Sequence, residues 1–448
     1  MASRILSRLL NHTHTIGNGN GLLQHWSRPL SILYPPGVDP ASTTPTRTVA
    51  EVVNNLTQCV IGGPVTYNPE KFKRQREALM DQLPSSQDEL PARRMMDSFD
   101  EAVIPLGSDL QLRDRYLTHF GGVRVGRLLE DMDVFAVHLV FNHMLNPKSD
   151  PDNPQSPFSI VTALVDRLDI KAKLCANEDV KIMGHVTWVG KSSAESTLEL
   201  YQFRDGRWVH VTEASFVLVV RDANTKGSSF VNPLVAETAE ERLLLERGER
   251  NKIERLAIAT DSLFKNPPSE EEKSLVHEFF IQTVDHSALS FKARCKPDGS
   301  QWMEDAKLKN IIICQPENRN RFNKIFGGFI MRQAFELAFA NAFVYSKTRP
   351  YVEHMDDISF KKPVDVGSLL YLNSQVCYTE ADKLQVRVSA EVLDPETGEL
   401  SLTNVFQYTF GVRGVDSRVP MVIPKTYHEA MMWLEGRRHY LNSVRDEA

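Results

Sequence analysis

The spacing of apolar residues along this chain changes from that of a strand to that of a long helix, and this succession occurs twice. At 310–314 an isoleucine-rich run, typical of a strand, leads into a polar loop that ends at Gly327 and Gly328. The loop continues directly into FIMRQAFELAFANAF, a segment with almost no charge and with the apolar spacing of a buried helix. The pattern predicts a strand, a loop and a long helix that begins at the glycine pair.

An earlier segment repeats this order. The sequence LTHFGGVRVGRLLEDMDVFAVHLVF places Gly126 at 202 positions before Gly328, and 169–190 matches 359–380 at an offset of 190. The difference of 12 corresponds to a longer connection at 146–157, where Pro, Asp and Ser are typical of a surface loop. Each copy reads as one strand, one long apolar helix and then several strands. We predict a tandem duplication of an α+β unit.

The remaining segments differ from the two copies in charge and composition. The linker is dense in charge around Leu243, Leu244 and Leu245, which favours a solvated connecting helix. The end of the chain reads as a short amphipathic helix to which the sequence assigns no role. The predicted organisation is a leader at 1–40, a polar helical lead-in at 41–90, a first domain at 91–235, a helical linker at 236–290, a second domain at 291–415 and a C-terminal helical tail at 416–448.

The N-terminal segment has the composition of a targeting leader. It contains no Asp or Glu through Val38, and Arg4 and Arg8 lie one helical turn apart among Ile and Leu residues. An acid-free, Arg- and Ser-containing amphipathic start resembles a mitochondrial presequence. We therefore expect a mitochondrial protein, located in the matrix.

Composition narrows the classes of function. The 448 residues are 42% hydrophobic and 25% charged, as in ordinary globular proteins, and the net charge of −6 gives no overall attraction to nucleic acid. No apolar run approaches the roughly 18 residues that an integral membrane helix needs. The chain has no GxSxG or HExxH motif and no CxxC spacing, so we expect no metal and no α/β-hydrolase site. The five cysteines are scattered and are expected to be reduced: Cys59, Cys175, Cys295, Cys314 and Cys377.

An acidic residue stands on the apolar face of the first predicted helix. Asp133 lies within the stripe formed by Leu129, Met132, Ala136 and Val140. Its neighbours Glu130 and Asp131 are expected to face solvent. Burial of a carboxylate without a partner costs several kcal/mol, so Asp133 is either hydrogen-bonded for structure or kept for catalysis. These residues alone leave both possibilities open.

The polar groups of the two copies are distributed unequally. Gly327 and Gly328 either serve a helix-capping loop or let the helix N–H groups bind developing negative charge. Phe335 is the residue of the second copy that is equivalent to Asp133 of the first. Thr118 is the residue of the first copy that is equivalent to Asn320 of the second. If the copies pair about a pseudo-twofold axis, Asp133 and Asn320 meet in one composite site, and the reciprocal site is disabled.

Two motifs carry a resemblance to a known family. PENRNRFNKIFGG before an apolar helix, and later SFKKPVDVGSLL, resemble the hotdog-fold acyl-coenzyme A (acyl-CoA) thioesterases over about 98–413. The resemblance implies two tandem hotdog domains of the α+β class, each a long central helix wrapped by an antiparallel β-sheet, paired as a pseudo-dimer. Asn320, the Gly327–Gly328 pair and Asp133 correspond to the family's site residues. Two positions depart from the pattern: Asn323 stands where many members have Gly, and Val125 replaces one Gly of the pair in the first copy.

The resemblance implies hydrolysis of a fatty acyl-CoA to a free fatty acid and CoA, without a cofactor. Asn320 would position the thioester or the water, and the N–H groups near Gly327 and Gly328 would stabilise the oxyanion. Asp133 would act as general base toward water or attack directly to form an anhydride. A homo-oligomer is expected at the family level.

Several further residues and two other functions fit parts of the sequence. Lys361 and Lys362 could meet the CoA phosphates, although a solvated strand edge explains them as well. His119, His138 and His143 are interpreted as packing or surface residues. The alternatives to a thioesterase are an acyl-CoA sensor that binds without turnover and a hotdog acyl-CoA hydratase, which would need an inward Asp and His pair in one copy.

Overall fold

The computed structural model describes most of the chain after the predicted leader. The described residues are 41, 44–56, 74, 84–145, 158–166, 168–170, 174–222, 227–258, 262–288, 290–320, 323–414 and 418–445. The predicted leader at 1–40 and the insertion at 146–157 lie outside these ranges. No helix within the described part of the chain is both long and apolar enough to cross a membrane.

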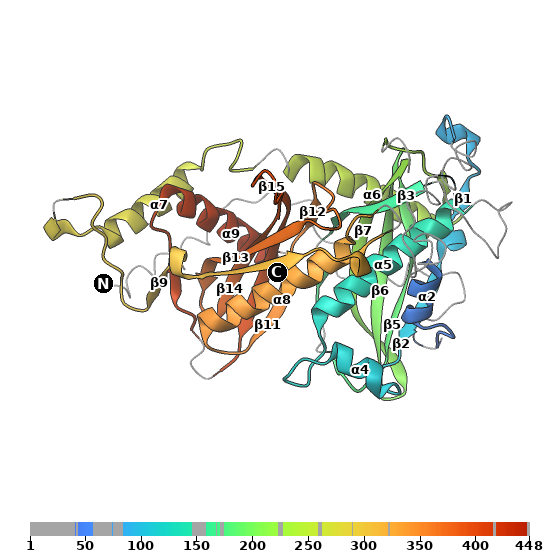
Figure 1. Ribbon diagram of the computed structural model, residues 1–448, viewed down its shortest axis with the longest axis horizontal. Helices are drawn as coiled ribbons and strands as arrows, with labels where there is room; N and C mark the ends of the chain where they lie inside the picture. Colours follow the sequence, from blue (N-terminus) through green and yellow to red (C-terminus); the bar gives the residue numbers. More distant parts are fainter. Residues whose placement is uncertain are drawn as a thin grey trace.

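The helices and strands form two units with the same order of elements, apart from α4, which has no α-helical counterpart in the second unit (Figure 1). The first unit contains α2 (Val49–Leu56), β1 (Arg93–Arg94), β2 (Asp100–Ile104), α4 (Leu110–Tyr116), α5 (Val125–Met144), β3 (Phe158–Val165), β4 (Leu168–Asp169), β5 (Val180–Val189), β6 (Ser193–Arg204), β7 (Arg207–Asp222), β8 (Leu234–Val235) and α6 (Ala239–Ile258). The second contains α7 (Glu270–Thr283), β9 (Ser300–Trp302), β10 (Lys307–Ile313), α8 (Gly327–Ser346), β11 (Pro350–Met355), β12 (Ile358–Phe360), β13 (Leu369–Glu380), β14 (Lys383–Leu393), β15 (Leu400–Val412), β16 (Met421–Ile423) and α9 (Tyr427–Arg445). Short 3₁₀ turns occupy Gln87–Glu89, Met95–Ser98, His286–Ala288, Met303–Asp305 and Pro316–Asn318.

The repeat is visible in local geometry as well as in element order. Helices α5 and α8 each have 20 residues and begin 202 positions apart, as the sequence predicted. The loops before them close with equivalent bridges, Leu117 to Val123 and Arg319 to Ile325. The register shifts between Val186 and Trp188 in β5 and between Val376 and Tyr378 in β13, which preserves the offset of 190.

One antiparallel sheet of 12 strands joins the two units. Its order is β10-β13-β14-β15-β12-β3-β7-β6-β5-β2, and β11 and β4 pair beside this path. The four strands at one end, β10-β13-β14-β15, correspond in order to the four at the other end, β2-β5-β6-β7, and exchange of the units interchanges the two central pairs, β12-β3 and β4-β11. Two short strands make the junction, because β12 of the second unit pairs with β3, and β4 of the first pairs with β11. Backbone hydrogen bonds therefore run continuously between the units.

The two long helices lie against each other on one side of this sheet (Figure 1). Helix α5 packs on β5, β6 and β7, and α8 packs on β13, β14 and β15. The predicted stripe of α5 is buried together with Asp133: Leu129, Met132, Ala136 and Val140 are each at most 2% exposed. Residues of α5, α8 and both halves of the sheet form one hydrophobic core.

Glycines allow close approach where the helices cross. A Cβ atom on Gly328 would lie 2.9 Å from the Cα atom of Glu130, and one on Gly126 would lie 3.1 Å from Cγ of Arg332. Positions 130 and 332 are equivalent in the two units, and their side chains form an ion pair with Arg332 Nε 3.3 Å from Glu130 Oε2. The crossing thus has a charged pair at its centre.

The expectation that Glu130 and Asp131 face solvent was wrong. Glu130 pairs with Arg127 and Arg332, and Asp131 accepts a 2.6 Å hydrogen bond from the Tyr116 hydroxyl. The prediction used a helix with one buried stripe, whereas α5 is enclosed on several sides by the sheet, α4 and α8. Burial raises the pKa of Asp131 to about 7.

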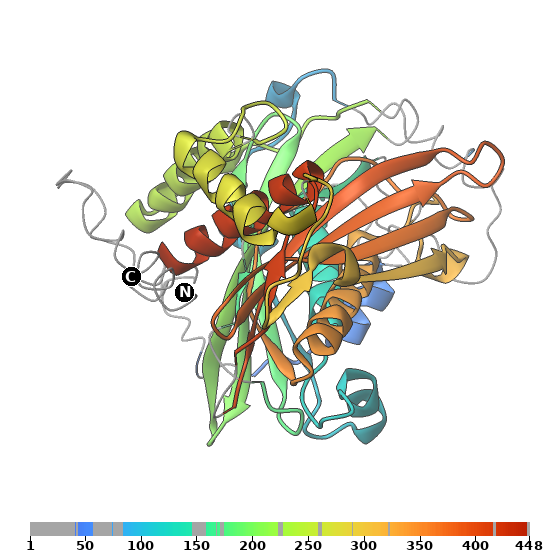
Figure 2. The ribbon, with the colours of Figure 1, turned by 90° about the vertical axis from the view of Figure 1, so that its left-hand side faces the viewer.

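The opposite face of the sheet carries α6, α7 and α9 (Figure 2). Helix α6 packs on β5 through Gly248, where a Cβ atom would lie 2.4 Å from the Trp188 side chain. Helix α9 packs on β13 in the same manner through Gly436, 2.7 Å from Cys377 Sγ. The charged segment at 236–290 and the C-terminal segment therefore supply helices in equivalent places on the two halves of the sheet.

Candidate active site

Asp133 is the polar group most deeply enclosed at the contact between the units. It is 0% exposed, and its Oδ2 atom accepts a 2.7 Å hydrogen bond from the backbone N–H of Gly328, in the other unit. Its Oδ1 atom accepts a 2.6 Å hydrogen bond from the Thr162 hydroxyl of β3. Removal of the carboxylate from water raises its pKa to about 6, although both hydrogen bonds act in the opposite direction. The group is therefore poised to exchange a proton near neutral pH.

The glycine pair brings the N-terminus of α8 to this carboxylate. A Cβ atom on Gly327 would lie 3.0 Å from the Phe360 ring and 3.5 Å from Asp133 Oδ1, so these three residues meet at one point. The Gly328 N–H is already used by Asp133. Within the described residues the Gly327 N–H has no partner, because it belongs to the first turn of the helix. The two glycines thus differ: one amide holds the carboxylate, and the adjacent amide can serve a ligand.

We expect Gly328→Ala to destabilise the protein more than the equivalent change Gly126→Ala. The new Cβ atom would lie within about 3 Å of the backbone Cα and O atoms of Glu130, which can move only if the helices separate. Such overpacking costs about 1–3 kcal/mol. In Gly126→Ala the nearest atom, at 3.1 Å, belongs to the Arg332 side chain, which can adjust. Urea unfolding of both variants would measure the difference, and equal stabilities would contradict the tight approach at Gly328.

Asn320 lies in the loop that leads into α8. It is buried, its N–H donates to the Lys324 carbonyl, and its Oδ1 atom accepts a 3.1 Å hydrogen bond from the Lys324 N–H. Phe326, the last residue before the helix, donates its N–H to the Asn318 carbonyl. These bonds fix the loop so that Asn320 is at the N-terminal end of α8, the end at which Asp133 is bound.

The two predicted lysines follow the strand that supplies Phe360. Lys361 and Lys362 are both exposed, and Lys362 Nζ donates a 3.0 Å hydrogen bond to Ser401 Oγ. They follow Phe360, whose ring would lie 3.0 Å from a Cβ atom on Gly327, by one and two residues. No carboxylate within the described residues lies in ion-pair distance of either lysine.

The three histidines near α5 lie in different environments. His138 contacts Asp100 and Asn142, and His143 is buried with Nε2 2.8 Å from the Asn232 carbonyl oxygen. Burial lowers the pKa of His143 to about 4, so it is neutral. Both are packing residues, as interpreted from the sequence, whereas His119 is exposed and lines a cavity. No His, Cys, Asp and Glu cluster within the described ranges is arranged to hold a metal ion.

Sequence reasoning missed two residues that contact the site. Thr162 binds Asp133, and Phe360 covers Gly327. Thr162 belongs to β3 and Phe360 to β12, the two strands that join the units. Thr162 carries no motif, and Phe360 lies within the SFKKPVDVGSLL motif but was not singled out as a site residue.

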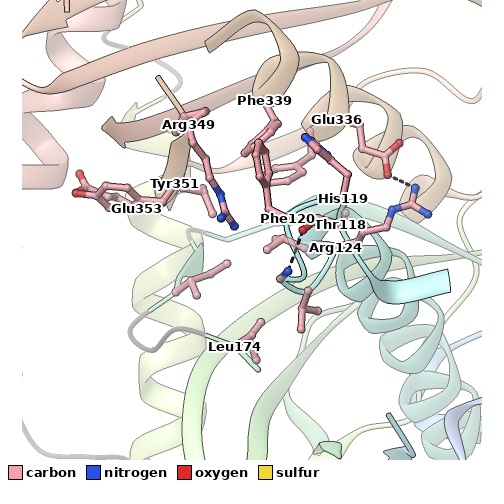
Figure 3. Close-up of a pocket in the computed structure, with 18 of the residues that line it drawn as sticks. Thr118, His119, Phe120, Arg124, Leu174, Glu336, Phe339, Arg349, Tyr351 and Glu353 are labelled. Atoms are coloured by element: carbon pink, nitrogen blue, oxygen red, sulfur yellow. Dashed lines mark hydrogen bonds and ion pairs between the residues drawn. The ribbon is translucent and has the colours of Figure 1, made fainter. Parts of the chain in front are cut away.

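A large cavity occupies the reciprocal position. Its volume is about 1190 Å³, and its lining includes Thr118, Gly126 and Phe335, the counterparts of Asn320, Gly328 and Asp133 (Figure 3). Ile170, which also lines it, is the counterpart of Phe360 at the offset of 190. The Asp133 site and this cavity are therefore built from equivalent backbone segments, but their polar side chains differ.

Fold and site together define a class of protein. A long apolar helix wrapped by an antiparallel sheet is the hotdog type of α+β fold, and a buried carboxylate held at the N-terminus of a partner helix suits acyl transfer to water. Comparison with known proteins supports this class. The chain is 45% identical to mitochondrial acyl-CoA thioesterase 9 of Mus musculus and 44% identical to that of Homo sapiens, each time over 394 residues and 88% of both chains. It is 35% identical to mitochondrial acyl-CoA thioesterase 4 of Humulus lupulus, over 79% of this chain and 68% of the relative.

The chain belongs to the acyl-CoA thioesterase family and, within it, to the mitochondrial acyl-CoA thioesterase 9 group. This relationship supports the mitochondrial location predicted from the N-terminal sequence. No protein-family model matches the chain. Among solved structures, an acyl-CoA hydrolase from Staphylococcus aureus bound to butyryl-CoA and CoA aligns over 33% of this chain and 93% of its own, at 22% identity and a TM-score of 0.31. The 12:0-ACP thioesterase from Umbellularia californica aligns over 70% and 95%, at 9% identity and a TM-score of 0.43.

Proposed function

We propose that this protein hydrolyses fatty acyl-CoA to a free fatty acid and CoA through one composite site, in which Asp133 comes from the first unit and Asn320 from the second. The observation that carries the proposal is the hydrogen bond between Asp133 Oδ2 and the Gly328 N–H, which joins the two units at 2.7 Å. This bond connects Asp133, the acid on the predicted apolar stripe of α5, to the glycine pair that follows the Asn320 loop.

The proposed reaction begins with proton transfer to Asp133. Each carboxylate oxygen has a second lone pair beyond the one used by Thr162 or Gly328, so Asp133 can accept a proton from a water molecule. The resulting hydroxide adds to the thioester carbonyl carbon and forms a tetrahedral oxyanion. The C–S bond then breaks, the proton held by Asp133 passes to the CoA thiolate, and the acid is released.

The Gly327 N–H is the proposed donor to the oxyanion. It lies beside Asp133 at the positive end of α8, where a backbone amide costs no reorganisation during the reaction. Asn320 would orient the thioester carbonyl or the attacking water through its carboxamide. Lys361 and Lys362, both exposed after Phe360, would contact the CoA phosphates.

At the level of architecture, we infer two tandem hotdog domains that pair as a pseudo-dimer within one chain. The order of the sheet, in which the four strands at each end correspond and the two central pairs are interchanged when the units are exchanged, supports this pairing. We further propose that the protein works in the mitochondrial matrix and forms a homo-oligomer.

The experiment that tests the function is CoA release by the purified protein from a panel of acyl-CoA substrates. Single-turnover reaction in H₂¹⁸O extends the test to mechanism, because attack of water on the aspartyl carbonyl of an anhydride would place ¹⁸O in the Asp133 carboxylate. General-base catalysis places the label in the fatty acid alone, so ¹⁸O in Asp133 would contradict it. Binding of acyl-CoA without any CoA release would overturn the proposed function.

We expect the activity to fall below about pH 6, tenfold for each further pH unit. The base must be ionised, and burial raises the pKa of Asp133 to about 6 from its ordinary value of 3.8. The Thr162 hydrogen bond favours the ionised form, so Thr162→Val should raise this pKa and move the acidic limb of kcat/KM to higher pH. A profile measured between pH 4.5 and 8.5 tests both statements. An acidic limb that stays in place in Thr162→Val would argue against Asp133 as the titrating group.

A further inference from the structure

The cavity opposite the proposed active site retains the geometry of a site without its catalytic groups. Phe335 fills the position of the Asp133 carboxylate and packs against Tyr408 and Phe410, with ring centroids 5.6 and 6.0 Å apart. Thr118 fills the position of Asn320, and its Oγ1 atom accepts a 3.0 Å hydrogen bond from the Gly122 N–H. The hydroxyl thus preserves the turn that Asn320 makes in the other unit, and the carboxamide is lost.

The acidic residues of this cavity each have a basic partner. Glu336 pairs with Arg124, Glu353 pairs with Lys383, and Asp169 Oδ1 lies 2.8 Å from His354 Nδ1. None takes the place of Asp133 beside a helix N-terminus. A thioester bound here would meet no base comparable to Asp133.

Part of the cavity lining is apolar. Ile170, Leu174 and Phe339 line the cavity together with Phe335 and with Val125 of the first turn of α5. These side chains can receive an acyl or other uncharged chain, because they offer apolar surface within the cavity. Phe360 is the equivalent of Ile170 in the proposed active site, where it covers Gly327.

Two arginines line the cavity, Arg413 and Arg349, the second of which is labelled in Figure 3. The Arg349 guanidinium lies 4.3 Å from the centroid of the Phe120 ring, and that of Arg413 lies 4.4 Å from the centroid of the Tyr351 ring. Both arginines are exposed, and neither forms an ion pair with a carboxylate within the described residues. Guanidinium groups that aromatic rings hold in place, without an acidic partner, are suited to bind phosphate groups.

We propose that this cavity binds a second CoA thioester and does not hydrolyse it. The apolar side chains of the lining would receive the acyl chain and the uncharged arm of the ligand, and Arg349 and Arg413 would bind its phosphates. This inference rests on the proposed function, because it assumes that the reciprocal position carries out the hydrolysis. A free adenine nucleotide shares the phosphates but lacks the apolar chain, so the structure favours the thioester.

The test is the stoichiometry of binding, measured by titration calorimetry with a non-hydrolysable thioether analogue of an acyl-CoA. The full chain should bind two analogue molecules. The double variant Arg349→Ala/Arg413→Ala should bind one normally and the second at least about tenfold more weakly, since two charged contacts are removed. Both positions are exposed, so the variant should fold, and Arg207→Ala, an exposed arginine outside the cavity, serves as the control.

Each outcome separates this inference from the proposed function. One analogue per chain, together with normal CoA release, would overturn the second site and leave the composite active site intact. Two analogues per chain without any CoA release would overturn the proposed function and leave the second site intact. Titrations with free CoA and with ATP complete the test: a second site that binds ATP as tightly as the analogue would contradict a site for a thioester.

Discussion

Asp133→Asn is expected to lower CoA release by about 10³-fold or more, with the fold intact. General-base catalysis contributes typically 10²–10⁴-fold, and a carboxamide cannot accept the proton of the attacking water. The side chain keeps its size, and its hydrogen bonds can be satisfied: Oδ1 can accept from the Gly328 N–H, and the amide NH₂ can donate to the Thr162 hydroxyl. Steady-state kinetics with thermal unfolding of the same preparation would measure both properties.

The matched control is Asp131→Asn. Asp131 is two residues away on the same helix, its pKa is also raised by burial, and it binds the Tyr116 hydroxyl rather than the other unit. This variant should retain most of the activity, which would show that the loss in Asp133→Asn is not a general effect of removing a buried charge. Comparable losses in both variants, or activity that survives Asp133→Asn, would contradict the assigned role.

Asn320→Ala should lower kcat by about 10²–10³-fold. Removal of one positioned polar group at a developing oxyanion has effects of this size. Part of the loss would come from the loop, because the Asn320 Oδ1 atom accepts the Lys324 N–H and fixes the entry into α8. CoA release at saturating substrate, with KM determined in parallel, would measure the effect.

Thr118→Ala separates the direct role of the Asn320 carboxamide in the reaction from the effect of its loop hydrogen bond. Thr118 makes the equivalent turn in the first unit, where its Oγ1 atom accepts the Gly122 N–H. The change removes the same kind of loop hydrogen bond on the side that lacks Asp133, so the rate of hydrolysis should change by less than a factor of about three. If Thr118→Ala were as damaging as Asn320→Ala, the two positions would be equivalent in function and a single composite site would be wrong.

Much of the fold could be predicted from the sequence, because the apolar spacing of the helix and the repeat between the two copies are both clear. The apolar stripe of the first helix and the offsets of 202 and 190 predicted two long helices and the relative places of α5 and α8 and of β5 and β13. The inward direction of Asp133 followed from its spacing to Met132 and Ala136. The sequence did not predict how fully α5 is enclosed, and Glu130 and Asp131 were placed in solvent for that reason.

The site itself was predictable only in part. The loop and glycine pair of the second unit are contiguous, and a resemblance to known thioesterases could find them. Thr162 and Phe360 belong to strands that are distant in sequence from both, and they reach Asp133 and Gly327 because β3 and β12 pair at the junction of the sheet. The division of roles between the Gly327 and Gly328 amides also depends on which N–H faces the carboxylate.

The sequence by itself determined the two copies, the elements of each and the unequal distribution of Asp133 and Asn320 between them. These properties depend on local spacing, which a helix or strand converts directly into a buried face. Only the tertiary structure decided that the Asp133 carboxylate binds an amide of the other unit, that its pKa is raised to about 6, and that an open cavity lies at the reciprocal position. Desolvation and contacts between distant segments have no local signature, because they arise only when two helices approach closely enough for a glycine to be required at their crossing.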